Sequence, residues 1–124
     1  MNVVDSSGWL EYFADGPNAG FFAPAIERLP ELIVPTLSVF EVFKRVFRQR
    51  DESQALQAAA LMYQGQLADL TASLAVEAAR LSCSLRLPMA DSIMLATARA
   101  YGATLWTQDA DFAGMTGVRY RPAG

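Results

Sequence analysis

Residues 31–50 read ELIVPTLSVFEVFKRVFRQR, and this stretch contains the two patterns that decide the fold. Its first part, residues 31–35, is a short apolar run closed by a proline, which is typical of a buried strand. The remainder, opened by Thr36 or Ser38, has apolar residues at helical spacing. A short buried strand that leads directly into a helix is the building unit of an α/β domain.

The same alternation extends along the chain in both directions. Short apolar runs predict strands at residues 1–5, 67–70, 103–106 and 118–121. Helical spacing predicts helices at residues 9–13, 21–29, 51–67, 73–85 and 88–101, with a short turn or helix at 109–112. We expect a hydroxyl of Ser6 or Ser7 to cap the first helix and Ser73 to cap a later one. The pattern predicts an α/β fold, with a mainly parallel central sheet of four to five short strands and helices on both faces.

The composition fits one compact domain over residues 1–124. The chain is 52% hydrophobic, so it can bury a core without disulfides or a structural metal. The single cysteine, Cys83, has no partner thiol and is predicted to be a small buried residue. No apolar run approaches the roughly 20 residues needed to span a bilayer, and no signal-peptide pattern precedes Asp5. We expect a cytoplasmic protein without membrane contact.

The net charge of −3 argues at first against a nucleic-acid ligand, because phosphate binding normally needs a basic surface. Four of the 13 acidic residues belong to the candidate site described next, which leaves nine acids against ten Lys and Arg. The rest of the molecule is therefore close to neutral. A divalent cation at the acidic site would remove most of the objection.

Four carboxylates, those of Asp5, Glu41, Asp91 and Asp109, lie among apolar residues at predicted element ends. Asp5 and Asp109 follow strands, whereas Glu41 and Asp91 are expected on the first turns of helices. Ligands of parallel α/β sheets bind at the carboxyl ends of the strands, so we expect the four acids to meet there. Taken singly, each acid can instead be a helix cap or an intrahelical partner.

The chain has no histidine, which restricts the chemistry of such a site. Clustered carboxylates repel each other unless one is protonated or a cation lies between them. Oxygen ligands without imidazole or thiolate suit a hard ion, Mg²⁺ or Mn²⁺. Metal-assisted phosphoryl transfer is the chemistry that follows, and histidine acid–base ribonuclease chemistry is excluded.

Four motifs occur in a defined order. They are Asp5-Ser6-Ser7, Glu41 in a helix after a strand, ADSIMLATA at residues 90–98, and TQDADF at residues 107–112. Together they cover nearly the full chain and resemble the PIN-domain family, and the chain length resembles that of its VapC-type toxins. The resemblance implies a Mg²⁺- or Mn²⁺-dependent endoribonuclease. It also implies a VapB-type antitoxin partner and a homodimer within a larger toxin–antitoxin complex.

The resemblance also assigns roles to individual residues. It implies that Asp5 and Asp91 are the principal metal ligands and that Asp109 and Glu41 complete the acidic pocket, Asp109 as a further ligand. A carboxylate would help to activate the attacking water. The implied supporting residues are Ser6, Thr107 and Asp111, of which Asp111 is expected to orient the turn rather than to bind metal.

Two further sets of residues have open interpretations. Lys44, Arg45 and Arg48 can guide an RNA backbone toward the metal, or they can pair with acids such as Glu41 and Asp51 within or near their own helix. An aromatic set near the N-terminus is either core or, by the resemblance, an antitoxin-binding groove. Its members are Trp9, Tyr12, Phe13, Phe21 and Phe22.

Two other function classes compete with the nuclease. One is a non-catalytic PIN-like module that binds RNA or protein, although such a module has little reason to retain four mutually repelling acids. The other is a phosphatase or phosphoacceptor domain with Asp5 as nucleophile. The haloacid-dehalogenase pattern needs an acid where Ser7 lies, and a receiver domain needs a late lysine, whereas Lys44 is the only lysine.

Overall fold

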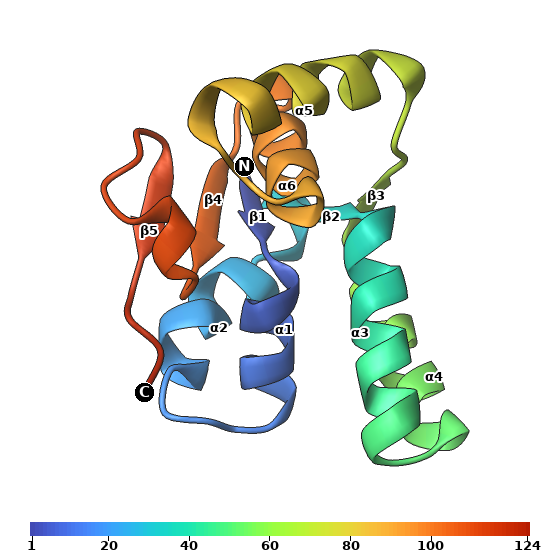
Figure 1. Cartoon of the computed structure of the whole chain (residues 1–124). Coiled ribbons are helices and arrows are strands. Elements are labelled where there is room, and N and C mark those ends of the chain that lie inside the picture. The colour runs from blue at the N-terminus through green and yellow to red at the C-terminus, as the bar shows by residue number, and fades with distance from the viewer.

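The computed structural model describes residues 1–124 and contains one five-stranded parallel sheet in the order β3-β2-β1-β4-β5 (Figure 1). The strands are β1 (Asn2–Val4), β2 (Leu32–Pro35), β3 (Gln66–Ala68), β4 (Thr104–Thr107) and β5 (Val118–Tyr120). All five predicted strands are present, and the predicted α/β class with a parallel sheet is confirmed.

Six helices connect these strands and pack in pairs, α1 with α2, α3 with α4, and α5 with α6 (Figure 1). They are α1 (Ser6–Phe13), α2 (Ala19–Glu27), α3 (Thr36–Gln49), α4 (Glu52–Met62), α5 (Ala72–Leu85) and α6 (Met89–Ala100). Two single 3₁₀ turns, η1 (Leu29–Glu31) and η2 (Ala110–Phe112), precede β2 and follow β4. None of the six helices has the length and apolar character that a membrane crossing requires.

Successive residues of the central strands face opposite sides of the sheet, so the molecule has two core layers. On one side, Val4 and Trp106 pack in a cluster with residues of α1 to α4. On the other side, Val3 and Leu105 pack with residues of α6 and η2. Helices therefore cover both faces, as the continuous apolar character of the strands predicts.

The path of the chain creates a switch point between β1 and β4. The β1–β2 and β2–β3 connections, through α1/α2 and α3/α4, step outward from β1 in one direction. The connection through α5 and α6 then returns, and β4 pairs with the other side of β1. In open α/β sheets, ligands bind at the carboxyl ends of the strands at such a point. Asp5 and Asp109 follow these two strands.

The hydroxyl caps predicted for two helices were wrong, whereas the alternative that an acid caps a helix is confirmed for Asp5. The carboxylate of Asp5, rather than a serine hydroxyl, caps α1 by accepting a hydrogen bond from the Gly8 amide. Thr71, rather than Ser73, caps α5 through the amide of Leu74. In both cases the helix begins before the predicted residue, because a better-placed acceptor lies just upstream.

Three side-chain placements also differ from expectation. Cys83 is exposed, not buried; it follows Ala78 by five residues, which turns it about 140° away from the buried row of α5. Phe40 and Phe47, two of the apolar residues at helical spacing after residue 35, are 61% and 48% exposed, because α3 buries a narrower stripe than that spacing predicts. Glu41 lies on the second turn of α3, not the first, because that helix begins at Thr36.

Candidate active site

Asp5 is a buried carboxylate at the end of β1, with only 5% of the residue exposed. Its Oδ1 accepts hydrogen bonds from Ser7 Oγ at 2.8 Å and from the Gly8 amide at 2.9 Å. Its Oδ2 accepts a hydrogen bond from the Thr107 hydroxyl. Both oxygens are thus oriented by donors from the first turn of α1 and from the end of β4, beside the switch point.

The electrostatics of Asp5 favour a nearby cation. Burial raises its pKa, whereas the hydrogen bonds from Thr107, Gly8 and Ser7 lower it, and the charge of Asp109 raises it further. Burial has the largest effect, so the pKa remains above the ordinary value. A charged Asp5 therefore needs more compensation than its hydrogen bonds supply.

Gly8 allows the backbone to approach closely enough for this arrangement. A Cβ at this position would lie 2.6 Å from Phe22 Cε1 and 2.7 Å from Val4 Cγ1, both in the core. Real side chains do not tolerate such distances. The first turn of α1, which carries the Gly8 amide toward Asp5, is thus seated directly on the core.

Thr107 connects the two acids that follow β1 and β4. Its buried hydroxyl donates to Asp5 and accepts from the Asp109 amide at 2.9 Å. Asp109 in turn caps η2 by accepting from the Asp111 amide at 2.9 Å. This chain of hydrogen bonds holds the loop after β4 against the end of β1.

Asp91 lies on the first turn of α6 and forms an acidic group with Asp109 and Asp111. One carboxylate oxygen of each lies within 4.8 Å of those of the other two. Burial, the charge of Asp109 and a hydrogen bond and charge from Asp111 raise the pKa of Asp91 to about 7, with a smaller contribution from the charge of Asp5. The four acids therefore influence one another, with Asp5 adjoining the group of three.

The residues of this group fit a hard divalent cation. No Lys or Arg neutralises them, since the two ion pairs of the structure are Arg28–Glu31 and Arg80–Glu77. All donor atoms are carboxylate oxygens, which suits Mg²⁺ or Mn²⁺. The geometry differs from the motif-based expectation for two residues. Asp111, expected only to orient the turn, belongs to the group, whereas Asp5, expected to be a principal metal ligand, is not one of its three members.

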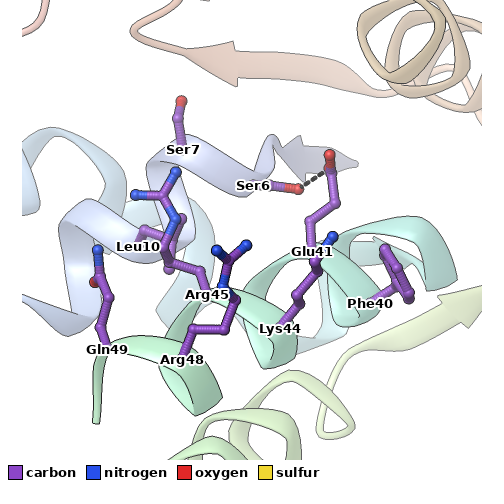
Figure 2. Close-up of a pocket in the computed structure, with 9 residues that line it drawn as sticks. All are labelled: Ser6, Ser7, Leu10, Phe40, Glu41, Lys44, Arg45, Arg48 and Gln49. Atoms are coloured by element: carbon purple, nitrogen blue, oxygen red, sulfur yellow. Dashed lines mark hydrogen bonds between the residues drawn. The ribbon is translucent and has the colours of Figure 1, made fainter.

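Glu41 lies beside this group rather than within it. Ser6 Oγ donates to Glu41 Oε1 at 2.6 Å, and Figure 2 shows the Glu41 carboxylate pointing from α3 toward the start of α1. Ser6 therefore supports Glu41, whereas Ser7 supports Asp5. The serine that bonds to Asp5 was not predicted, because the run Ser6-Ser7 offers two hydroxyls and does not indicate which faces the acid.

The predicted basic residues line a cavity of about 640 Å³ between α1 and α3 (Figure 2). Neither Lys44, Arg45 nor Arg48 forms an ion pair, so pairing with acids on their own helix is not observed. Asp51, one suggested partner, instead caps α4 through the Gln54 amide. The lining residues are Ser6, Ser7, Leu10, Phe40, Glu41, Lys44, Arg45, Arg48 and Gln49.

The aromatic set divides into core and surface residues. Trp9 and Phe22 are 1% and 0% exposed and belong to the core, so for these two residues the core interpretation holds and the groove interpretation does not. Tyr12, Phe13 and Phe21 are half-buried and pack against that core.

Asn18 forms hydrogen bonds near the site that no sequence pattern predicts. The side-chain amide of Asn18 donates to Gln108 Oε1 at 3.0 Å and to the Pro122 carbonyl at 2.9 Å. Asn18 is buried, and its backbone N–H donates to Glu11 Oε2 at 2.8 Å. The loop before α2 thereby holds Gln108, next to Asp109, and the C-terminal segment. Its partners are about 90 or more residues away in sequence.

Comparison with known proteins identifies the class to which this fold and site belong. Residues 3–118 match the PIN domain family, and the chain belongs to that family. No curated protein matches the sequence.

Solved structures with the same fold include three from bacteria. A toxin–antitoxin complex from Klebsiella pneumoniae has 22% identity and a TM-score of 0.81, with 96% of each chain covered. VapC20 of Mycobacterium tuberculosis, a sarcin–ricin loop cleaving toxin, has 22% identity and a TM-score of 0.75, with 96% of this chain and 99% of that chain covered. VapBC2 of Rickettsia felis, bound to a DNA fragment from its promoter, has 12% identity and a TM-score of 0.74, with 98% and 97% covered.

Proposed function

We propose that this PIN-domain protein is a divalent-metal-dependent endoribonuclease of the VapC type, the toxin of a toxin–antitoxin pair. The observation that carries the proposal is the group formed by Asp91, Asp109 and Asp111, next to Asp5, at the switch point of the sheet. A cluster of acids without a basic partner is unfavourable unless one acid is protonated or a cation occupies the cluster. The family of the chain and the RNA-cleaving toxin among its structural relatives support RNA as the substrate.

The acids of the site would have different roles. Asp91, Asp109 and Asp111 would hold Mg²⁺ or Mn²⁺, and Asp5 would complete the coordination or orient a bound water. When bound, the ion supplies charge to the scissile phosphate and lowers the pKa of the attacking water. Glu41, held by Ser6, borders the acids on the side of the basic cavity. From there it can accept a proton from water or orient it.

An antitoxin of the VapB type is the partner we infer. One structural relative, from Klebsiella pneumoniae, is described as a toxin–antitoxin complex, and another, from Rickettsia felis, is VapBC2. The half-buried aromatics Tyr12, Phe13 and Phe21 provide apolar anchors for a partner segment. We further infer a cytoplasmic homodimer within the larger complex.

Substitution of the acids tests the nuclease directly. Asp91→Asn and Asp5→Ala should reduce RNA cleavage by antitoxin-free protein to background and abolish growth arrest on expression, because each removes a carboxylate from the acidic site. Asp15→Asn is a matched control: Asp15 is exposed at the end of α1 with a φ of 52°, a conformation that asparagine also adopts. Cleavage by Asp91→Asn at the wild-type rate would refute the proposal.

The competing assignment, a non-catalytic binding module, is separated by a second measurement. Calorimetry with Mn²⁺ should show binding to the wild-type protein. RNA binding without Mn²⁺ binding or cleavage would favour the module.

A further inference from the structure

We propose that Phe40, together with Lys44 and Arg48, forms a nucleotide subsite in which a base of single-stranded RNA stacks on the Phe40 ring beside the acidic site. This inference rests on the proposed nuclease function and specifies how its substrate is held. It starts from an exposed aromatic side chain that the packing of the domain does not explain.

Phe40 is 61% exposed, the most exposed aromatic side chain of the protein. The other exposed phenylalanine of α3, Phe47, stacks on Phe43 with ring centroids 5.9 Å apart. Phe40 has no aromatic partner, and its one notable contact is with Lys44, whose Nζ lies 5.7 Å from the ring centroid. The ring is thus held near a cation but is not used by the core.

Helical spacing aligns this ring with the basic residues. Phe40, Lys44 and Arg48 occur at intervals of four and therefore form one ridge along α3, since residues four apart lie on the same helix face. Glu41, Arg45 and Gln49 form the neighbouring ridge at the same interval. Both ridges line the cavity against α1. Figure 2 shows Phe40 at one end of the lining residues and Arg48 and Gln49 toward the other.

The composition of the cavity matches a nucleotide. Only Phe40 and Leu10 are apolar among its nine lining residues, whereas three residues are cations without ion pairs. An aromatic face next to Lys and Arg is the combination that binds single-stranded nucleic acid, because bases stack and phosphates pair with the cations. The volume, about 640 Å³, lies within the range of roughly 300–1,000 Å³ that is usual for small-ligand sites.

The position of the cavity connects it to the chemistry. Glu41 is adjacent to Phe40 in sequence and bonds to Ser6, which follows Asp5 directly. The cavity that Phe40 lines is thus connected through Glu41 and Ser6 to Asp5, so an RNA strand with one nucleotide stacked on Phe40 can extend toward the acids. Stacking on a side chain requires an unpaired base, so the subsite selects single-stranded RNA over a duplex.

The test measures RNA binding with cleavage blocked. Full-length protein carrying Asp91→Asn binds a short, fluorescein-labelled single-stranded RNA of mixed sequence, followed by fluorescence anisotropy. Adding Phe40→Leu should weaken binding roughly five- to tenfold, the effect of one lost stacking contact. Phe47→Leu, the matched control on the same helix, should leave it unchanged. Phe40→Trp should restore binding, which a role in folding alone does not predict.

A spectroscopic readout identifies the stacking itself. 2-Aminopurine placed along the RNA should be quenched at one position by the protein with Phe40 and not by the Phe40→Leu variant. Equal affinities for Phe40→Leu and Phe47→Leu would overturn the subsite. So would a changed oligomeric state of Phe40→Leu with unchanged RNA affinity, because Phe40 would then contact a second copy.

The two proposals fail separately. Cleavage retained by Asp91→Asn refutes the nuclease assignment, whereas cleavage lost in Asp91→Asn with no effect of Phe40→Leu refutes the subsite alone.

Discussion

The acidic group at the sheet switch point and the basic face of α3 lie next to each other but are built in opposite ways. Asp5 is buried, and both of its oxygens accept hydrogen bonds from Ser7, Gly8 and Thr107. Lys44, Arg45 and Arg48 are exposed and form no ion pairs. The first region is preorganised by backbone and hydroxyl contacts, and the second keeps its side chains free.

This difference predicts which kind of change each region tolerates. A preorganised site loses function when a supporting contact is removed, because its geometry is set by the surrounding shell. A flexible cationic surface loses affinity by small, roughly additive steps that depend on salt. Substitutions in the acidic group should therefore have larger effects than substitutions on the basic face of α3.

Thr107→Val should cause the largest loss among substitutions that leave all acids in place. It removes the donor to Asp5 and the acceptor for the Asp109 amide. We expect cleavage and Mn²⁺ affinity to fall roughly 10–100-fold, as for other supporting groups of metal sites. The free energy of unfolding should fall by about 1–3 kcal/mol, because buried polar groups lose their partners. Thr107→Ser should retain most activity; equal loss in both variants would contradict the role of the hydroxyl.

Gly8→Ala tests the contact between the acidic site and the core. The added Cβ would meet Phe22 and Val4, so α1 must shift, and stability should fall by about 1–3 kcal/mol. Gly20→Ala is the control, since nothing lies within 4 Å of that position in α2, and it should be neutral or slightly stabilising. Chemical denaturation measures both, and a stable Gly8→Ala protein with full cleavage would show that the site does not depend on this close approach.

The acidic group should make the metal-free protein less stable as pH rises. The pKa of Asp91 is raised to about 7 in the folded protein, so between about pH 4 and pH 7 the folded state binds more protons than the unfolded state. The stabilisation that comes from protonated Asp91 is fully present below about pH 4 and is lost as pH rises through about 7. Thermal unfolding in EDTA should show this decrease, and Asp91→Asn should reduce it. The raised pKa of Asp91 would be contradicted if stability rose between about pH 4 and pH 7 in the wild-type protein and not in Asp91→Asn.

Neutralising the basic face should produce the smallest effects. Lys44→Gln and Arg48→Gln should each weaken RNA binding a few-fold at moderate salt. Each should reduce the slope of log affinity against log salt by somewhat less than one. The chemical step at saturating RNA should remain unchanged. A variant that lowers the saturated rate as strongly as Thr107→Val would place that cation within the catalytic site instead.

The alternation of short apolar runs with helical patterns was sufficient to predict the fold. Short continuous apolar runs between helices are typical of strands in a parallel sheet that is covered on both faces. The prediction was least accurate for the edge strand β3, expected at residues 67–70 and observed at Gln66–Ala68. Only Ala68 of its three residues is buried, so little apolar pattern marks Gln66–Ala68. The positions of Asp5 and Asp109 at the carboxyl edge of the sheet were also predictable, since both follow central strands.

The remaining details depend on contacts that no local pattern encodes. Asp111 joins Asp91 only because α6 and η2 pack on the same side of the sheet, and those residues are 20 positions apart. The assignment of Ser6 to Glu41 and of Ser7 to Asp5 depends on how α1 is rotated against α3. The exposure of Phe40 could not be predicted, because periodicity indicates which side chains are apolar, not how wide a stripe the neighbouring helices cover.

Mn²⁺ calorimetry on single-carboxylate variants can establish whether Asp91, Asp109 and Asp111 form one metal site with Glu41 beside it. Wild-type protein should bind Mn²⁺, Asp91→Asn and Asp111→Asn should lose that binding, and Glu41→Gln should largely retain it. Wild-type affinity in Asp111→Asn, or no Mn²⁺ binding to the wild-type protein, would contradict the account.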